Sequence, residues 1–288
     1  MTVTQKQVQD KFQEWNMSLA TGYQIYSVNK ESYVEPHTVA SVVTDQYDFY
    51  GILFATKSGK YRDERAMITD YFNHFVQNKP VGTIVQENII TSDKFGIQGG
   101  TYNFHLTDYE TKEESDVLCD FTFVSKLGED GKLKFIHHHS SMKAHAADDP
   151  VLDDLMHDFK RAYGHEIRAG LTNFQSPRGV CASTFEDSLK ESNEKSNKSG
   201  NNIAMTQQAF VALDDGCVLH CGHLNVSTAE GEGFREVGHR FTLIFNKFGQ
   251  CVCQQISKNP EKPEGVLIKP ALAAKMTGTA PQPELANK

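Results

Sequence analysis

Long apolar segments are absent from this 288-residue sequence: no run approaches the roughly 20 residues that a membrane-spanning helix needs. Positive charge is also scarce, because 29 Lys and Arg face 37 Asp and Glu, for a net charge of −8. This balance argues against nucleic acid and anionic membranes as partners. The first residues lack the apolar core of a signal peptide. We therefore expect a soluble cytoplasmic protein, or a plastid protein without its transit peptide.

Cysteine is sparse as well. Six cysteines in a chain of this length do not indicate a disulfide framework, and we expect buried free thiols. On regular strands Cys217, Cys221 and His223 share one face, and Cys251 and Cys253 share another. Such a cluster is able to bind a metal through thiolates, although its spacing is not that of a zinc finger.

The elements that are present follow a simple order. Amphipathic spacing predicts helices over 4–20, ending at Thr21-Gly22, and over 66–77, with a strand over 48–56 between them. Hairpin signals predict four more strands, at 82–92, 96–107, 116–126 and 133–142. Helices followed by a strand meander predict an α+β cone, in which a curved antiparallel sheet packs on helices.

The same order returns in the second half. A helix over 151–171 precedes predicted strands at 203–213, 217–227, 234–246 and 250–256. Phe121-Thr122 recurs 120 residues later as Phe241-Thr242, which indicates two copies of one domain. We predict domains at 1–147 and 148–268, followed by a flexible tail at 269–288.

The two copies differ where chemistry is expected. With a two-residue deletion in the last turn, His137, His138 and His139 align with Gln255, Ile256 and Ser257. We therefore expect the first domain to carry the activity and the second to be a degenerate partner.

The run His137-His138-His139-Ser140-Ser141 closes the predicted strand 133–142. On a regular strand Leu133, Phe135, His137, His139 and Ser141 share one face, while His138 and Ser140 share the other. The first of these faces changes from apolar to imidazole and hydroxyl groups. That change predicts a strand that leaves a core and enters a polar pocket.

Several segments together resemble a known superfamily: Trp15-Asn16, Thr21-Gly22, the strand end Leu53–Thr56, the helix Ile68–Phe75, Gly100–Phe104 and the His-His-His-Ser-Ser ending. They resemble the SnoaL-like branch of the NTF2-like superfamily, in the group related to the association domain of calcium/calmodulin-dependent protein kinase II. Within that group the histidine-rich ending resembles iota-class carbonic anhydrases. The resemblance implies tandem NTF2-like cone domains with an internal pocket, and a homo-oligomer such as a dimer.

By motif, the resemblance assigns the pocket to Thr56, Tyr71, His139 and Ser141. Reversible hydration of carbon dioxide to bicarbonate requires a base for one proton of water, and an imidazole with a pKa near 6.5 suits that role. We therefore predict His139 as the base. Thr56, Tyr71, Ser141 and His137 are expected to bind water and bicarbonate, without a metal or other cofactor.

Three alternatives stay open. In a metal-dependent site, His137 and His139 require a third ligand for Zn or Mn, such as His105 or His74. The chain is otherwise a non-enzymatic association module, or a SnoaL-like isomerase that acts on a hydrophobic ligand. Pocket size distinguishes the isomerase from the carbonic anhydrase, because a large apolar pocket favours the isomerase and a small polar one favours carbon dioxide. The fold alone cannot decide.

Overall fold

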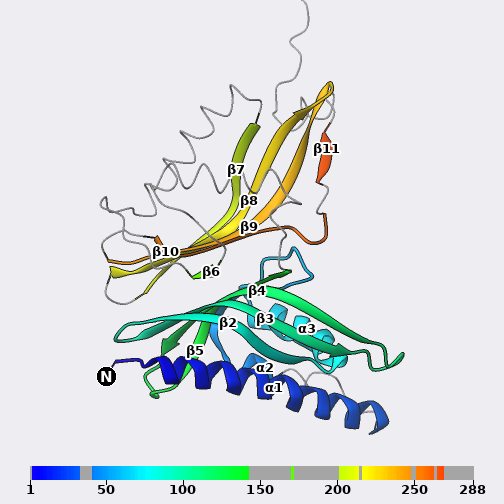
Figure 1. Ribbon diagram of the computed structural model, residues 1–288, viewed down its shortest axis with the longest axis vertical. Helices are drawn as coiled ribbons and strands as arrows, with labels where there is room; N and C mark the ends of the chain where they lie inside the picture. The colour runs from blue at the N-terminus through cyan, green and yellow to red at the C-terminus, as the bar shows by residue number, and fades with distance from the viewer. Residues whose placement is uncertain are drawn as a thin grey trace, which may run out of the picture.

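The computed structural model describes residues 2–32, 41–142, 170–171, 201–213, 216–247, 251–262 and 265–268. Within them the chain forms two curved, mainly antiparallel sheets that lie face to face, with helices on the far side of the first sheet (Figure 1). This arrangement confirms the predicted α+β class. No helix among the described residues is long and apolar enough to cross a membrane.

We call residues 2–32 and 41–142 the first cone. Its elements are α1 (Gln5–Ser32), α2 (Ser41–Thr44), β1 (Tyr47–Phe54), α3 (Arg65–Phe75), a 3-10 turn η2 (Val76–Asn78), β2 (Val81–Thr91), β3 (Phe95–Thr107), β4 (Glu114–Leu127) and β5 (Leu133–Met142). The sheet order is β1-β5-β4-β3-β2, with β1 parallel to β5 and the other pairs antiparallel. The predicted helices and strands of this half are therefore confirmed, with small shifts at their ends except at the end of α1.

The core of the first cone lies between α1 and the sheet. Phe12, Trp15 and Leu19 of α1 are buried against Phe121 and Phe123 of β4. The prediction that α1 ends at Thr21-Gly22 is wrong, since the helix continues to Ser32. Its additional turns pack on the cone, and the ring centroids of Tyr26 and Tyr109 lie 5.3 Å apart. Such packing outweighs the roughly 1 kcal/mol that a glycine costs inside a helix.

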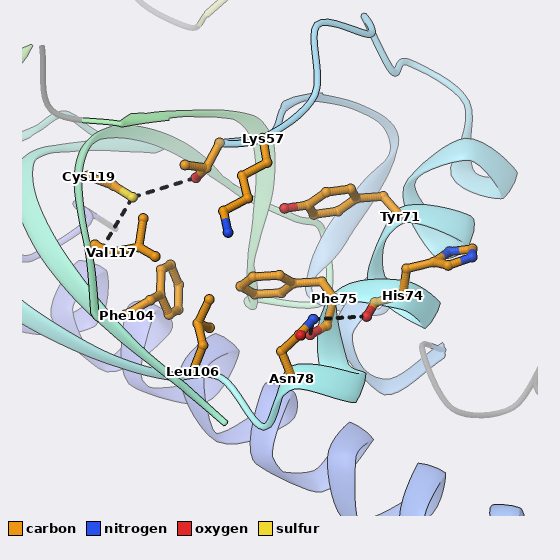
Figure 2. A pocket seen from close by; sticks show the side chains of 10 residues that line it. Lys57, Tyr71, His74, Phe75, Asn78, Phe104, Leu106, Val117 and Cys119 are labelled. Atoms are coloured by element: carbon orange, nitrogen blue, oxygen red, sulfur yellow. Dashed lines mark hydrogen bonds between the residues drawn. The ribbon is translucent and has the colours of Figure 1, made fainter. Parts of the chain in front are cut away.

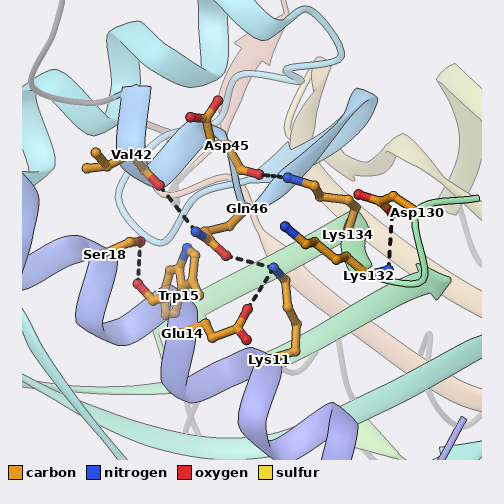
Figure 3. A network of polar contacts seen from close by, with 10 residues as sticks. All are labelled: Lys11, Glu14, Trp15, Ser18, Val42, Asp45, Gln46, Asp130, Lys132 and Lys134. Carbon is orange, nitrogen blue, oxygen red and sulfur yellow. Dashed lines mark hydrogen bonds and ion pairs between the residues drawn. The ribbon is translucent and has the colours of Figure 1, made fainter. Parts of the chain in front are cut away.

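A polar network anchors the start of β5 (Figure 3). Lys11 of α1 is only 5% exposed, and its Nζ donates a hydrogen bond to Gln46 Oε1 at 2.6 Å. Burial lowers the pKa of Lys11. The Gln46 carbonyl accepts the backbone N–H of Phe135 at 3.0 Å, and Lys134 Nζ donates to the Asp45 carbonyl. These contacts hold the histidine-bearing strand against α1 and the start of β1.

The second sheet contains β6 (Gly170–Leu171), β7 (Asn201–Ala212), β8 (Val218–Glu230), β9 (Gly233–Phe245), β10 (Cys251–Lys258) and β11 (Val266–Ile268). Its order is β6-β10-β9-β8-β7, and β11 also pairs with β9. The helix predicted over 151–171 is wrong at its last two residues, which form β6; the rest of it lies outside the described residues. The boundary at 147/148 and the tail at 269–288 also lie outside them and stay predictions.

Matching irregularities support the duplication. One extra residue bulges from β2 at Val85, and one bulges from β7 at Thr206, next to equivalent pairs of their ladders. A second pair of bulges occurs at Ile136 of β5 and Val252 of β10. A bulge bends a strand and increases its twist, so bulges at matching places give the two sheets matching curvature.

The strand ladders correct the predicted alignment of the last strand. Thr122 pairs with His139 in the first sheet, and its counterpart Thr242 pairs with Gln255 in the second. The predicted alignment of His139 with Ser257 is therefore wrong by two residues. It relied on two turn glycines, whereas turns change length more readily than strands change register. The counterparts of His137, His138, His139, Ser140 and Ser141 are Cys253, Gln254, Gln255, Ile256 and Ser257.

Candidate functional site

The bulge at Ile136 decides which side chains of β5 enter the cone. Phe135 belongs to the core around α1, whereas Ile136 packs in the cluster between the two sheets. His137 faces the second sheet as well, with its Nε2 2.8 Å from Thr242 Oγ1. Because side chains alternate with a period of two, one extra residue exchanges the faces of every residue after it. His138 and Ser140 thus face into the cone, and the predicted face is wrong beyond Phe135.

Three residues predicted for the pocket therefore lie between the sheets. His139 Nδ1 is 2.8 Å from Thr242 Oγ1, and its Nε2 is 2.9 Å from Ser257 Oγ. Ser141 Oγ accepts a hydrogen bond from Gln255 Nε2 at 2.9 Å. Burial lowers the pKa of His137 to about 3, and that of His139 falls well below its ordinary value for the same reason. The structure does not bring His137, His139 and Ser141 together with Thr56 and Tyr71.

A different set of polar groups meets inside the first cone. Tyr102 OH donates a hydrogen bond to Ser140 Oγ at 2.5 Å, and Ser140 Oγ also contacts Thr56 Oγ1. His138 Nε2 lies 3.4 Å from Tyr102 OH, and its Nδ1 lies 2.8 Å from Tyr47 OH. The result is a continuous series of hydrogen-bonding groups, which we call the hydroxyl–imidazole chain: Thr56, Ser140, Tyr102, His138 and Tyr47.

Every member of this chain is neutral near pH 7. The ring of His138 stacks on Phe123 with centroids 4.0 Å apart, and burial holds its pKa well below the ordinary range. Burial also raises the pKa of Tyr47 and Tyr102 well above that of a free phenol. The buried imidazole is thus in its proton-accepting form, and its tautomer depends on which tyrosine donates to it.

Two spaces that share four lining residues open onto this chain. The outer one is a cavity of about 200 Å³ whose walls are largely apolar, and Lys57 Nζ points into it (Figure 2). The inner one has a volume of about 10 Å³, close to the lower limit for holding one water molecule. It reaches His138, Ser140 and Tyr102. The shared residues are Thr56, Tyr71, Phe75 and Phe104.

Thr56 and Tyr71, both predicted, line these spaces from two different elements. Thr56 follows β1, which pairs with β5 and so places it beside Ser140. Tyr71 lies on α3; burial raises its pKa above the ordinary value, while the Arg62 guanidinium, 5.0 Å from its ring centroid, acts in the opposite direction. Sequence reasoning missed His138, Ser140 and Tyr102 as pocket groups. Tyr102 lies in the Gly100–Phe104 segment, and its only sequence signal is a phenol among apolar core positions.

The predicted third ligands for a metal, His105 and His74, lie apart from His137 and His139. Among the described residues, no three His, Cys, Asp or Glu side chains are grouped closely enough to hold a metal ion. His105 lies 3.3 Å from Asp116 at the surface, and His74 lines the outer cavity.

A bulge decides which way the cysteines of β10 face, as it does for the histidines of β5. The five that are described are buried thiols that form no disulfide, as predicted. Cys217, Cys221 and Cys253 belong to the apolar cluster between the sheets, which does not include Cys251. Because Val252 is a bulge residue, Cys251 and Cys253 face opposite sides of β10, and the prediction that they share a face is wrong.

The chain was compared with known proteins. No protein-family model matches it, and no curated protein gives a significant match. A solved structure of a putative calcium/calmodulin-dependent protein kinase II association domain from Xanthomonas campestris is 34% identical and has a TM-score of 0.41; the match covers 48% of this chain and 87% of that one.

Two other solved structures are more distant. A cyanobacterial iota-carbonic anhydrase complexed with bicarbonate is 18% identical over 50% of this chain and 94% of that chain, with a TM-score of 0.40. An NTF2-like protein with a cystatin-like fold from Novosphingobium aromaticivorans is 7% identical over 49% and 84%, with a TM-score of 0.36. On the identity to the Xanthomonas domain, the chain belongs to the NTF2-like superfamily, in the group related to the association domain of calcium/calmodulin-dependent protein kinase II.

Proposed function

We propose that the first cone catalyses the reversible hydration of carbon dioxide to bicarbonate, using the hydroxyl–imidazole chain. One observation carries the proposal: hydroxyl groups of Thr56, Ser140 and Tyr102 connect a water-sized space to a neutral buried imidazole, His138. Preorganised donors in a site that excludes bulk water stabilise developing charge more strongly than they do in water. The proposal keeps the predicted Thr56 and Tyr71 but replaces His139 and Ser141 with their neighbours.

The proposed reaction balances without a further reagent. A water molecule in the inner space attacks the carbon of carbon dioxide in the outer cavity, and one C=O electron pair moves onto oxygen. For this relay the Tyr102 O–H turns from Ser140 Oγ to His138 Nε2. The proton that water loses then passes to Ser140 Oγ, the Ser140 proton passes to Tyr102, and the Tyr102 proton passes to His138 Nε2. Positioned proton transfer contributes about 10²–10⁴-fold when the pKa of the base lies near the operating pH. Burial holds the pKa of His138 below that pH and makes it a weaker base. The proton returns to solvent by the same route after bicarbonate leaves.

The outer cavity supplies the groups that recognise the product. Tyr71 lines both spaces, and its protonated phenol is suited to donate to a bicarbonate oxygen. The Lys57 ammonium group points into the outer cavity and attracts the anion electrostatically (Figure 2). This route uses only side chains of the chain, and a divalent metal such as Mn or Zn remains the alternative.

The test is a stopped-flow hydration assay at pH 8 on two adjacent serines. Ser140→Ala removes the first proton relay, and we expect it to lower kcat/KM by about 100-fold or more. Ser141→Ala is the matched control, since Ser141 faces the second sheet, and we expect a change of less than about three-fold. A folded but inactive wild-type protein would reject the enzyme proposal. A larger loss in Ser141→Ala would favour the motif-based assignment, and activity lost to a chelator would favour a metal.

A second candidate is a ligand-binding association module. The outer cavity is larger than carbon dioxide requires, yet smaller than the roughly 300–1,000 Å³ of common small-molecule pockets. That size and Lys57 favour a small organic carboxylate over the bulky ligand of a SnoaL-like isomerase. Calorimetry with benzoate, using Lys57→Met as the control, tests this candidate. Sedimentation analysis tests the proposed homo-oligomer, a dimer.

A further inference from the structure

The two sheets contact each other through equivalent faces. His139 Nε2 lies 2.9 Å from Ser257 Oγ, and in the reciprocal position Gln255 Nε2 donates to Ser141 Oγ, also at 2.9 Å. The contact between His137 and Thr242 at 2.8 Å likewise has its reciprocal contact, between Cys253 and Thr122 at 3.8 Å. When a residue of one sheet contacts a residue of the other, the counterparts of these two residues also contact each other. This is the rule of a two-fold symmetric dimer. Here the pseudo-two-fold relates two halves of one chain.

One pair of equivalent positions breaks this symmetry. Asp120 on β4 corresponds to Arg240 on β9. The Asp120 carboxylate accepts a hydrogen bond from Thr101 of its own sheet at 3.0 Å. Arg240 is 1% exposed and reaches across the interface, where its Nη1 donates to the carbonyls of Ala55 at 2.5 Å and Ser58 at 3.0 Å. The buried guanidinium of Arg240, from the second sheet, therefore contacts the backbone of the first cone.

The carbonyls that Arg240 contacts belong to the site. Ala55 and Ser58 lie on either side of Thr56 in the segment 55–62, which we call the pocket loop. Arg240 Nη2 also lies 3.5 Å from the carbonyl of Ser140, the residue whose hydroxyl touches Thr56. One planar guanidinium thus connects the Ser140 carbonyl with the carbonyls of Ala55 and Ser58, which flank Thr56. A lysine ammonium lacks this fork of donors.

A second contact from the same half supports the pocket loop. Glu261 Oε1 accepts hydrogen bonds from Ser58 Oγ at 3.0 Å and from the Gly59 N–H at 3.1 Å. Ser58 Oγ in turn accepts a hydrogen bond from Arg62 Nη2 at 2.9 Å, and the Arg62 guanidinium lies over the Tyr71 ring. The loop that bears Thr56 therefore contacts the second half of the chain at Ala55, Ser58 and Gly59.

We infer that Arg240 is a positioning residue for the pocket of the first cone: it holds the pocket loop against Ser140, so that the hydroxyls of Thr56 and Ser140 stay in contact. The inference rests on the proposed function for its catalytic consequence. The second half of the chain is then a component of the site, because it supplies the group that fixes two of the reacting hydroxyls. Misplacement of catalytic groups by about 1 Å costs on the order of 100-fold in rate.

The test compares three variants of the full-length chain by amide hydrogen exchange and hydration kinetics. In Arg240→Met we expect exchange in the pocket loop to rise at least ten-fold, and kcat to fall about 10–100-fold with little change in KM. Arg240→Lys keeps the positive charge but lacks the planar set of N–H donors, and we expect intermediate changes in pocket-loop exchange and kcat. Arg235→Met is the matched control, because Arg235 lies on the same strand and pairs with Glu230 at the surface. We expect it to leave loop exchange and kcat unchanged.

The amide hydrogen exchange data test the positioning role of Arg240 independently of the proposed function. Unchanged pocket-loop exchange in a folded Arg240→Met protein would overturn it, whatever the activity. Exchange that rises equally around Thr242 would also overturn it, since Arg240 would then stabilise the interface as a whole. If Arg240→Met does not fold, the same two criteria apply to Arg240→Lys. An inactive wild type rejects the proposed function, and the exchange contrast still tests the positioning role.

Discussion

The inner face of the first sheet carries polar groups that the inner face of the second sheet lacks at its described positions. At the interface, some equivalent positions keep their apolar character, as Val124 and Ile244 do, whereas Asp120 and Arg240 differ. Inside the first cone stand His138, Ser140 and Tyr102, whereas the matching positions of the second sheet hold Gln254, Ile256 and Leu224. All six are buried. Packing has thus been retained in both copies, while the groups suited to proton transfer stand in one.

The largest expected effect comes from exchanging residues between the copies. His138→Gln introduces the residue of the second sheet, and we expect it to lower the hydration rate by about 10²–10⁴-fold because an amide does not accept the proton. Adding Gln254→His to that variant should restore nothing, since Ile256 and Leu224 offer no hydroxyl relay. Stopped-flow kinetics on both variants measures this. Recovery of activity in the double variant would show that the second sheet is also competent.

Acid should destabilise the protein more through β5 than through β10, because β10 carries Cys253, Gln254 and Gln255 where β5 carries three histidines. Burial lowers the pKa of all three histidines. The unfolded chain therefore binds more protons below about pH 6.5, and the free energy of unfolding falls as the pH drops beneath that value. Each histidine contributes about 1.4 kcal/mol per pH unit.

Urea unfolding between pH 5.5 and 7.5 measures this dependence. His139→Gln, which copies Gln255 of the second sheet, should reduce the slope of unfolding free energy against pH by one proton. An unaltered slope in a folded variant would contradict the buried neutral state of His139.

The smallest effect concerns the reciprocal threonines of the interface. Thr242→Val leaves His137 Nε2 and His139 Nδ1 without their hydroxyl partner, and we expect a loss of about 1–3 kcal/mol in the free energy of unfolding. Thr122→Val removes only a 3.8 Å contact to a thiol, and should cost less than about 1 kcal/mol. Chemical denaturation of the two variants compares them directly. Equal losses would mean that the interface is symmetric in energy as well as in geometry.

Much of the first cone could be predicted from its sequence, because apolar alternation and turn residues fix strands and their order. Thr56 and Tyr71 could be placed by motif. The faces to which the β5 side chains point could not be predicted, since no residue type indicates the bulge at Ile136. A single inserted position reverses the face of every residue after it. For this reason the sequence-based hypothesis selected His139 and Ser141 in place of His138 and Ser140. The length of α1 could not be predicted either, because packing against distant segments outweighs the free-energy cost of one glycine in a helix.

Joining the two copies in one chain has an evolutionary consequence at the pseudo-two-fold interface. In a dimer of identical subunits every substitution is made twice, so an arginine at this position would appear in both halves. A tandem chain frees each half to mutate alone, which is how Asp120 and Arg240 are able to differ. The covalent link also keeps the halves at a high effective concentration, so a half without these pocket residues does not dissociate on dilution.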